Sequence, residues 1–150
     1  MHSYEMTVLS APKDSTKGRM LLVRGLPGSG KSTFAKTFPM FFHIEADMWF
    51  CRHGDYNWKA EEAFAAHRWC RHTVQVILNQ GKDVIVANTF TTLKEMNDYI
   101  EYAEVNGHGI TVYTMKDDFG SIHNVPEETM ERMRARFVSH FNVIGAYNGQ

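Results

Sequence analysis

The sequence predicts an α/β protein in which helices pack against a mostly parallel central sheet. Short apolar runs of strand length alternate along the chain with longer segments of helical period, and this alternation is typical of parallel sheets. A glycine-rich turn lies between the first of these strands and the first helix. The length of 150 residues suits about one domain. We expect that domain at residues 18–150, preceded by a flexible arm at residues 1–17.

The first strand and helix flank the glycine-rich turn. Residues 19–24 read RMLLVR, an apolar run that predicts a buried strand. Residues 25–30 form the turn, and residues 32–38 predict a helix that Pro39 ends. A second strand is expected at residues 41–45. In parallel sheets ligands bind at the carboxyl ends of the strands, so the turn lies at the expected ligand edge.

The middle of the chain continues the alternation. Apolar residues at three- and four-residue spacing predict a long helix at residues 58–79. A buried strand follows at residues 83–87. Thr91 or Thr92 then caps a helix that runs to about Val105, since a glutamate stands where a capping box requires it.

The last part of the chain is less regular. Residues 110–115 predict another strand, and Pro126 starts a final helix with acidic residues in its first turn. The tail after His140 is weakly patterned. Four strands are evident and a fifth is not, so we expect one edge of the sheet to be trimmed or covered by a partner chain.

Composition and charge exclude several classes of protein. The formal net charge of −1 is unlike that of a strongly basic, non-specific nucleic-acid binder. Any nucleic-acid contact should therefore be local, at an end or a single nucleotide. Cys51 and Cys70 are expected to be reduced thiols. No apolar run is long enough for a membrane span and no signal peptide is evident, so we expect a cytoplasmic protein without membrane contact.

The glycine-rich turn carries the clearest chemical signal. Residues 25–32 read GLPGSGKS and match G-x-x-x-x-G-K-[ST] at every fixed position, between a strand and a helix. This motif, the P-loop, wraps backbone amides around the phosphates of a nucleotide. Lys31 is expected to reach the β and γ phosphates and Ser32 to bind Mg²⁺. The residues expected to bind ATP are Gly25, Pro27, Gly28, Ser29, Gly30, Lys31, Ser32 and Thr33. The fold class is thus a three-layer P-loop NTPase of the kinase type.

Asp47 follows the second predicted strand at the carboxyl edge of the sheet. A carboxylate at that edge is placed to accept the proton of an attacking hydroxyl. The alternative is an ordinary helix N-cap or surface carboxylate.

Four further residues are weaker candidates for a second shell or a lid. Asn88 and Thr89 follow the strand at residues 83–87, where they either hydrogen-bond a metal-bound water or cap the strand. Lys116 follows the last strand and Arg132 lies on the last helix. Either could stabilise a transferring phosphoryl group, or could belong to a mixed-charge surface.

Four stretches together resemble the small P-loop kinases related to bacteriophage polynucleotide 5′-kinase and the zeta toxins. The resemblance extends to short AAA-type ATP-binding proteins of phages and to kinase domains of eukaryotic ubiquitin-ligase-binding proteins. The stretches are GLPGSGKST at 25–33, EADMWF at 45–50 with HGDYNW after it, AHRWC at 66–70 with VIVANTFTTLKEM at 84–96, and SIHNVPEETMERM at 121–133. The resemblance implies phosphoryl transfer from ATP to a hydroxyl, Asp47 as general base, and a lid near residues 121–126 that contains His123.

The chain departs from that family at charged positions. Phe50 stands where an arginine is expected three residues after the catalytic aspartate, and Asn88 replaces an aspartate. The segment after Lys116 reads DDFG instead of containing lid arginines. The expected function is an ATP- and Mg²⁺-dependent kinase acting on a nucleic-acid 5′-hydroxyl. The alternatives are a kinase of a nucleoside, nucleotide or other small molecule, and a protein that only binds or slowly hydrolyses ATP.

Overall fold

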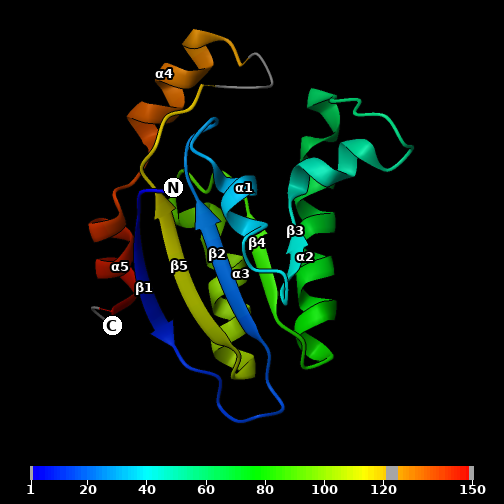
Figure 1. Ribbon diagram of the computed structural model, residues 1–150, viewed down its shortest axis with the longest axis vertical. Helices are drawn as coiled ribbons and strands as arrows, with labels where there is room; N and C mark the ends of the chain where they lie inside the picture. The colour runs from blue at the N-terminus through cyan, green and yellow to red at the C-terminus, as the bar shows by residue number, and fades with distance from the viewer. Residues whose placement is uncertain (1, 121–124, 149–150) are drawn as a thin grey trace.

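The structure, a computed structural model, describes residues 2–120 and 125–148 and contains a five-stranded sheet (Figure 1). The strands are β1 (Tyr4–Ser10), β2 (Arg19–Arg24), β3 (Phe42–Ile44), β4 (Val84–Ala87) and β5 (Gly109–Met115). Their order in the sheet is β1-β5-β2-β4-β3. β2, β3, β4 and β5 run parallel, whereas β1 is antiparallel to β5. The prediction of a mostly parallel sheet is therefore confirmed, and β2, the strand that precedes the P-loop, lies in the middle of the sheet.

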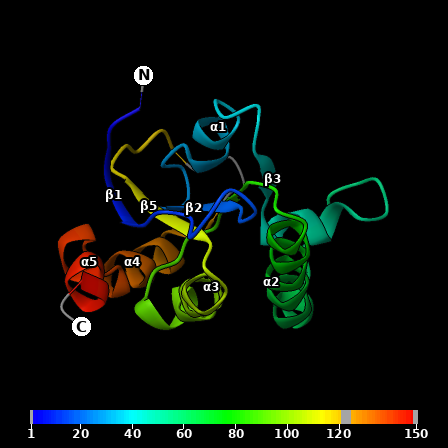
Figure 2. The ribbon, with the colours of Figure 1, turned by 90° about the horizontal axis from the view of Figure 1, so that it is seen from below.

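The helices form two layers of very different thickness. They are α1 (Lys31–Ala35), α2 (Ala63–Asn79), α3 (Leu93–Asn106), α4 (Glu127–Arg136) and α5 (His140–Asn148), with 3-10 helices η1 (Ala46–Cys51) and η2 (Ala60–Glu62). Figure 2 shows α2, α3 and α5 on one side of the sheet and the short α1 on the other. The predicted α/β layers are present, but the α1 layer is reduced to five residues.

The main core lies between the sheet and the long helices. Along α2, the buried residues Ala66, Cys70, Val74 and Leu78 recur every fourth position, which gives the helix one continuous apolar face. They pack with buried strand residues in a single cluster, and each fully buried aliphatic side chain contributes roughly 1.5–3 kcal/mol. The capping box predicted for α3 is present, with Thr92 as the N-cap. Both cysteines are free thiols, as predicted.

The expected flexible arm at residues 1–17 is wrong, because β1 pairs with β5 from Tyr4↔Met115 onward. Exposed and less exposed residues alternate regularly along β1, but the apolar residues Met6 and Val8 are among the exposed ones. Met6 and Val8 are exposed on the α1 side of the sheet, while the polar Glu5 and Thr7 are the more buried residues. Those polar groups are satisfied by partners elsewhere in the chain. β1 is thus the fifth strand that the sequence did not reveal.

The tail after position 140, expected to be weakly patterned, forms α5. His140 and Val143 are buried there, and Ile144 and Tyr147 pack against the core.

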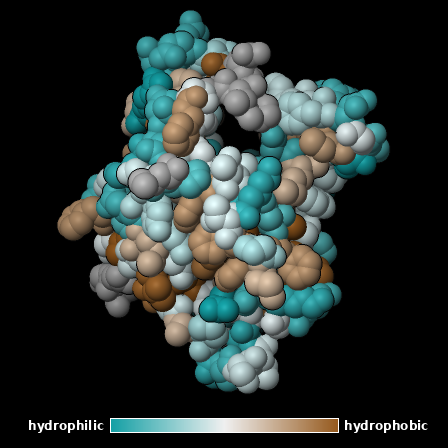
Figure 3. All heavy atoms as spheres, viewed as in Figure 1, coloured by the Kyte–Doolittle hydropathy of each residue, from teal (hydrophilic) through white to brown (hydrophobic). Residues whose placement is uncertain are grey.

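The opposite face of the sheet is less covered, and apolar side chains gather in the lower half of the view in Figure 3. A groove on this face is lined in part by Met6 and Phe41. None of the helices formed by the described residues combines the length and hydropathy that a bilayer crossing requires.

Candidate functional site

The P-loop connects β2 to α1 with the backbone geometry that its motif requires. Gly28 and Gly30 have φ values of 83° and 88°, in the left-handed region that other residues disfavour. The Gly25 amide donates to the Thr89 carbonyl at 3.2 Å, which ties the loop to the end of β4. A Cβ atom on Gly25 would lie 2.3 Å from the Ser29 hydroxyl oxygen. Glycine is therefore required at each of these three positions.

Two polar groups inside the P-loop lack an adequate counterpart. The Ser29 hydroxyl is buried and finds no hydrogen-bond partner among the described residues. The Lys31 ammonium donates to the Leu26 carbonyl at 3.0 Å. Burial lowers the pKa of Lys31 to about 8, although the charge of Glu45 partly opposes this. A buried hydroxyl and a partly buried cation both gain from an anion placed between them, so the loop fits a polyphosphate.

Glu45 is a residue of the site that the sequence analysis missed. It lies directly after β3, and its side chain is 16% exposed. Burial alone would raise the pKa of its carboxyl group, but hydrogen bonds from His43 and Ser32 and the Lys31 charge hold the pKa below its ordinary value. Of the other three P-loop candidates, Ser32 thus faces an ionised carboxylate, Pro27 is half-buried, and Thr33 is exposed on α1.

Asp47 lies in the first turn of η1, two residues beyond Glu45. Its Oδ1 accepts a hydrogen bond from the Tyr56 hydroxyl at 3.0 Å. Glu45 occupies the N-cap position of η1, so Asp47 does not cap this helix. Phe50, which stands where the family resemblance leads us to expect an arginine, is buried and its ring lies 6.4 Å from that of Tyr56. The core thus extends directly beneath the turn that carries Asp47.

The Asn88 side chain connects the end of β4 to the start of η1 and to α2. Its Oδ1 accepts a hydrogen bond from the Ala46 amide at 3.0 Å, and its Nδ2 contacts the Cys70 sulfur at 3.6 Å. The side chain therefore fixes the start of η1 against β4, as a cap would. Thr89 contributes its carbonyl to Gly25 of the P-loop. Both residues hold the loops of the ligand edge together.

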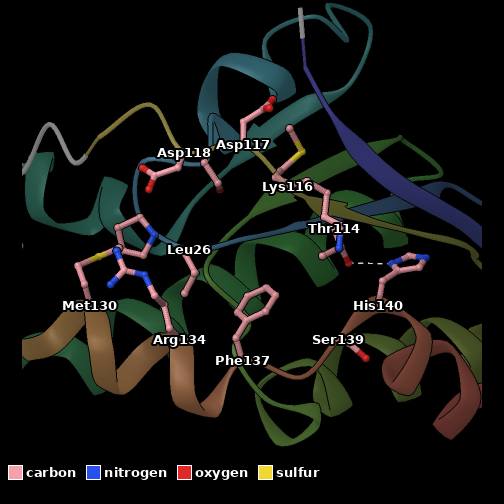
Figure 4. A pocket seen from close by; sticks show the side chains of 13 residues that line it. Leu26, Thr114, Lys116, Asp117, Asp118, Met130, Arg134, Phe137, Ser139 and His140 are labelled. Carbon is pink, nitrogen blue, oxygen red and sulfur yellow. Dashed lines mark hydrogen bonds between the residues drawn. The ribbon is translucent and has the colours of Figure 1, made fainter.

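A cavity of about 360 Å³ opens on the other side of the P-loop, toward β5 and α4. In Figure 4, Phe137 and Arg134 project into it from below, opposite Leu26. The lining residues come from the P-loop, the end of β5 and the α4 region: Leu26, Pro27, Ser29, Thr114, Met115, Lys116, Asp117, Asp118, Met130, Arg134, Phe137, Ser139 and His140. Five of these residues are apolar, and the other eight are polar or charged. The cavity therefore offers apolar contacts together with groups that can bind the polar parts of a small ligand.

Of the basic residues predicted for a second shell or a lid, Lys116 lines the cavity and Arg132 does not. Lys116 lines the cavity, but its ammonium lies 2.6 Å from a carboxylate oxygen of Glu5 in β1. Arg132 is exposed and bonds within α4, away from the cavity, whereas Arg134 lines it. His123 lies outside the described residues. The α4 cation that lines the cavity is thus two residues later than the one that the sequence analysis proposed.

Arg24, the last residue of β2, is a second residue that the sequence analysis missed. It is fully buried, and burial lowers its pKa to about 10. Its Nε donates to the Phe90 carbonyl at 3.1 Å, its Nη1 donates to Thr114 at 3.3 Å, and its guanidinium lies 4.1 Å from the centre of the Phe137 ring. Phe90 has a φ of 46°, unusual for a residue other than glycine. Arg24 therefore links the P-loop strand to the floor of the cavity.

Residues 20–118 match the model of a family described as an AAA domain. An uncharacterised protein of Pasteurella multocida, PM0531, is 26% identical over 76% of this chain and 73% of its own length. Human NEDD4-binding protein 2 is 27% identical over 80% of this chain, but the match spans only 8% of that protein.

Two solved structures share the fold at low identity. A chain of the Pnkp1/Rnl/Hen1 complex matches with a TM-score of 0.55 and 21% identity, over 77% of this chain and 38% of its own length. The APS kinase CysC of Mycobacterium tuberculosis matches with a TM-score of 0.50 and 14% identity, over 82% of this chain and 99% of its own. The family match covers the P-loop, Glu45 and Asp47. The chain belongs to this family of AAA domains and has the fold of the P-loop kinases.

Proposed function

We propose that the protein transfers the γ-phosphoryl group of ATP to a hydroxyl acceptor. The observation that carries the proposal is the contact between the P-loop helix and the acidic turn, which we define as Glu45 and Asp47: Lys31 and Ser32 face Glu45. Asp47 would take the proton of the attacking hydroxyl. The hydroxyl oxygen would then bond to the γ phosphorus of ATP, while the bond between the γ phosphorus and the bridging oxygen breaks and ADP leaves.

ATP would lie across the P-loop, with its phosphates and its nucleoside on different partners. The loop amides, the Ser29 hydroxyl and the Lys31 ammonium suit the phosphates. The nucleoside would occupy the cavity between Leu26 and Phe137, where an apolar wall meets an aromatic ring. Ser32 would hold a Mg²⁺ ion, which neutralises charge on the β and γ phosphates when it is bound.

The first acceptor to consider is the 5′-hydroxyl end of a nucleic acid. Tyr56 and Trp58 are aromatic residues close to Asp47 in the chain, with exposed fractions of 45% and 58%, and both pack against the Phe50 ring. Exposed rings of this kind stack on bases without reading sequence. One of the structures that share the fold belongs to an RNA repair complex. These observations support an acceptor with an unpaired base next to its hydroxyl.

A small acceptor, such as a nucleoside, a nucleotide or a sugar, is the second candidate. The formal net charge of −1 favours it, because a long polyanion gains little from such a surface. The third candidate is a protein that binds or slowly hydrolyses ATP. The buried Phe50 favours this third candidate, because Phe50 stands three residues after Asp47, where the kinases that this chain resembles have an arginine.

The test is transfer of label from γ-labelled ATP to a panel of 5′-hydroxyl oligonucleotides, nucleosides, nucleotides and sugars. The wild-type protein should label one class of acceptor, and Asp47→Asn and Lys31→Ala should abolish labelling. Glu101→Gln changes an exposed carboxylate on α3 and serves as the matched control. If the wild-type protein labels nothing in the panel yet hydrolyses ATP, the third candidate replaces the kinase.

A further inference from the structure

The acidic group at the ligand edge of this sheet comes from an unexpected strand. The resembling kinases lead us to expect an aspartate after β4, but Asn88 stands there. Its amide is engaged at both ends, with the Ala46 amide and the Cys70 sulfur. A carboxylate is present instead after β3, at Glu45. Because β3 and β4 are parallel neighbours, Glu45 and Asn88 emerge at the same edge of the sheet.

The Glu45 carboxylate contacts the P-loop residue Ser32 and is also hydrogen-bonded to His43. The Ser32 hydroxyl forms a hydrogen bond with its carboxylate, and Lys31 adds a positive charge nearby. The imidazole Nε2 of His43 lies 2.5 Å from Oε2 of Glu45, and both side chains are less than one-fifth exposed. His43 and Glu45 are two residues apart at the end of β3, so their side chains lie on the same side of the strand.

We propose that Glu45 binds the Mg²⁺ of the nucleotide together with Ser32, and that His43 holds the carboxylate in position for it. This inference rests on the proposed function, since it assigns a residue to the metal that accompanies ATP. Mg²⁺ is a hard cation that proteins hold through one or two carboxylates, with water and phosphate oxygens completing the shell. The serine hydroxyl and the Glu45 carboxylate supply two such oxygens on adjacent elements, and a group behind a metal ligand commonly fixes its orientation.

A purely structural role for Glu45 makes a different prediction. If the carboxylate only positioned Lys31, its loss would change nucleotide affinity to the same extent with and without metal. If it binds the metal, its loss should raise the Mg²⁺ concentration required for binding without weakening the affinity in EDTA. The discriminating measurement is therefore binding of a fluorescent, non-hydrolysable ATP analogue, titrated in EDTA and at increasing Mg²⁺ concentrations.

We expect Glu45→Gln to raise the Mg²⁺ concentration that half-saturates analogue binding by about tenfold or more. Affinity in EDTA should stay the same or become tighter, because a negative charge near the phosphates is removed. His43→Leu should shift the Mg²⁺ dependence in the same direction by a smaller factor. Glu101→Gln, on α3, should behave like the wild-type protein. Paramagnetic resonance of Mn²⁺ in the same complexes gives a second measure of metal affinity that does not depend on turnover.

The inference is overturned if Glu45→Gln retains the wild-type Mg²⁺ dependence, or if it weakens binding equally in EDTA and in Mg²⁺. Failure of the proposed function would look different, because the wild-type protein would then bind no analogue, or Lys31→Ala would bind as tightly as the wild type. Binding that depends on Lys31 but not on Glu45 would reject the metal assignment and leave the phosphotransferase proposal standing.

Discussion

The two sides of the P-loop differ in the residues that form them. On the β3 side, Glu45 directly follows β3 and Asp47 lies in the first turn of η1, and the buried Asn88 accepts a hydrogen bond from the Ala46 amide between them. On the β5 side, the cavity is bounded in part by Phe137, which follows α4 and whose ring lies 4.1 Å from the Arg24 guanidinium of β2. The β3 side presents two carboxylates, whereas the β5 side presents a cavity whose lining contains both apolar and charged side chains.

This difference suggests a division of labour. Groups that act on a transferring phosphoryl group must be held rigidly, because charge stabilisation and proton transfer depend on short, oriented contacts. A surface that binds a nucleoside tolerates adjustment, since its contribution comes from buried area. Substitution of Asp47 on the β3 side should therefore change the rate of transfer, and substitutions on the β5 side should change the affinity for nucleotide.

The largest expected effect is on the β3 side. Asp47→Asn keeps the size of the side chain but removes the base, so kcat should fall by about 10²–10⁴-fold. The dissociation constant for an ATP analogue should be unchanged, because Asp47 does not contact the P-loop amides in the proposed site. Rapid-quench transfer assays and analogue titration separate the two quantities. A large loss of affinity with normal kcat would contradict the division between the two sides.

A substitution in the cavity should give the opposite pattern. Phe137→Ala removes the aromatic floor, and the dissociation constant for ATP should rise by about tenfold, the typical scale for loss of one stacking ring. At saturating ATP, kcat should be close to that of the wild type. Phe137→Leu is the matched control, since it preserves bulk beside Arg24. Equal affinities for the wild-type and alanine proteins would place the nucleoside elsewhere.

The same contrast explains what could be predicted from the sequence. The P-loop was predictable because its motif fixes backbone conformation residue by residue, and Gly28 and Gly30 adopt the positive φ values that it requires. The mostly parallel character of the sheet followed from the alternation of strands and helices along the chain. β1 was missed because its apolar residues Met6 and Val8 face outward, so the usual link between apolar period and burial fails there.

Residues that act through space were the hardest to find. Glu45 became a candidate only when the sheet brought the end of β3 against Ser32, a contact between segments that share no local pattern. Arg24 stands at the end of an apolar run, and only its burial against Phe137 indicates a role. Arg132 and Arg134 are two positions apart on one helix, and sequence gave no basis for choosing the one that lines the cavity.

A smaller effect is expected from Tyr56→Phe, which refines the description of the β3 side. Burial and the hydrogen bond to Asp47 raise the pKa of the Tyr56 hydroxyl to about 12, so it stays protonated as a donor. One exposed hydrogen bond is worth up to about 1 kcal/mol, so kcat should change by about fivefold or less. Comparison of kcat for Tyr56→Phe and Tyr56→Leu separates loss of the hydroxyl from loss of the ring.

The smallest effect concerns the β5 side and depends on pH. His140 lines the cavity and joins Thr114 in β5 to Thr7 in β1 through its two ring nitrogens, at 2.8 and 3.0 Å. Burial lowers its pKa, as do the charges of Arg24 and Lys116, while Glu5 opposes them. The folded protein therefore favours the neutral imidazole, and the unfolded chain binds the proton more readily.

This linkage fixes the sign of the pH dependence. The contribution of His140 to stability is fully present above the ordinary histidine pKa of about 6.5 and is lost as the pH falls through the lower pKa of the folded state. Urea unfolding at pH 7.5 and pH 5.5 should show a smaller loss of stability for His140→Asn than for the wild type. His53→Asn, in an exposed loop, controls for removal of an imidazole. An identical loss in wild type and His140→Asn would mean that protonation of His140 does not weaken the junction between β1, β5 and the cavity, and that acid acts on the molecule elsewhere.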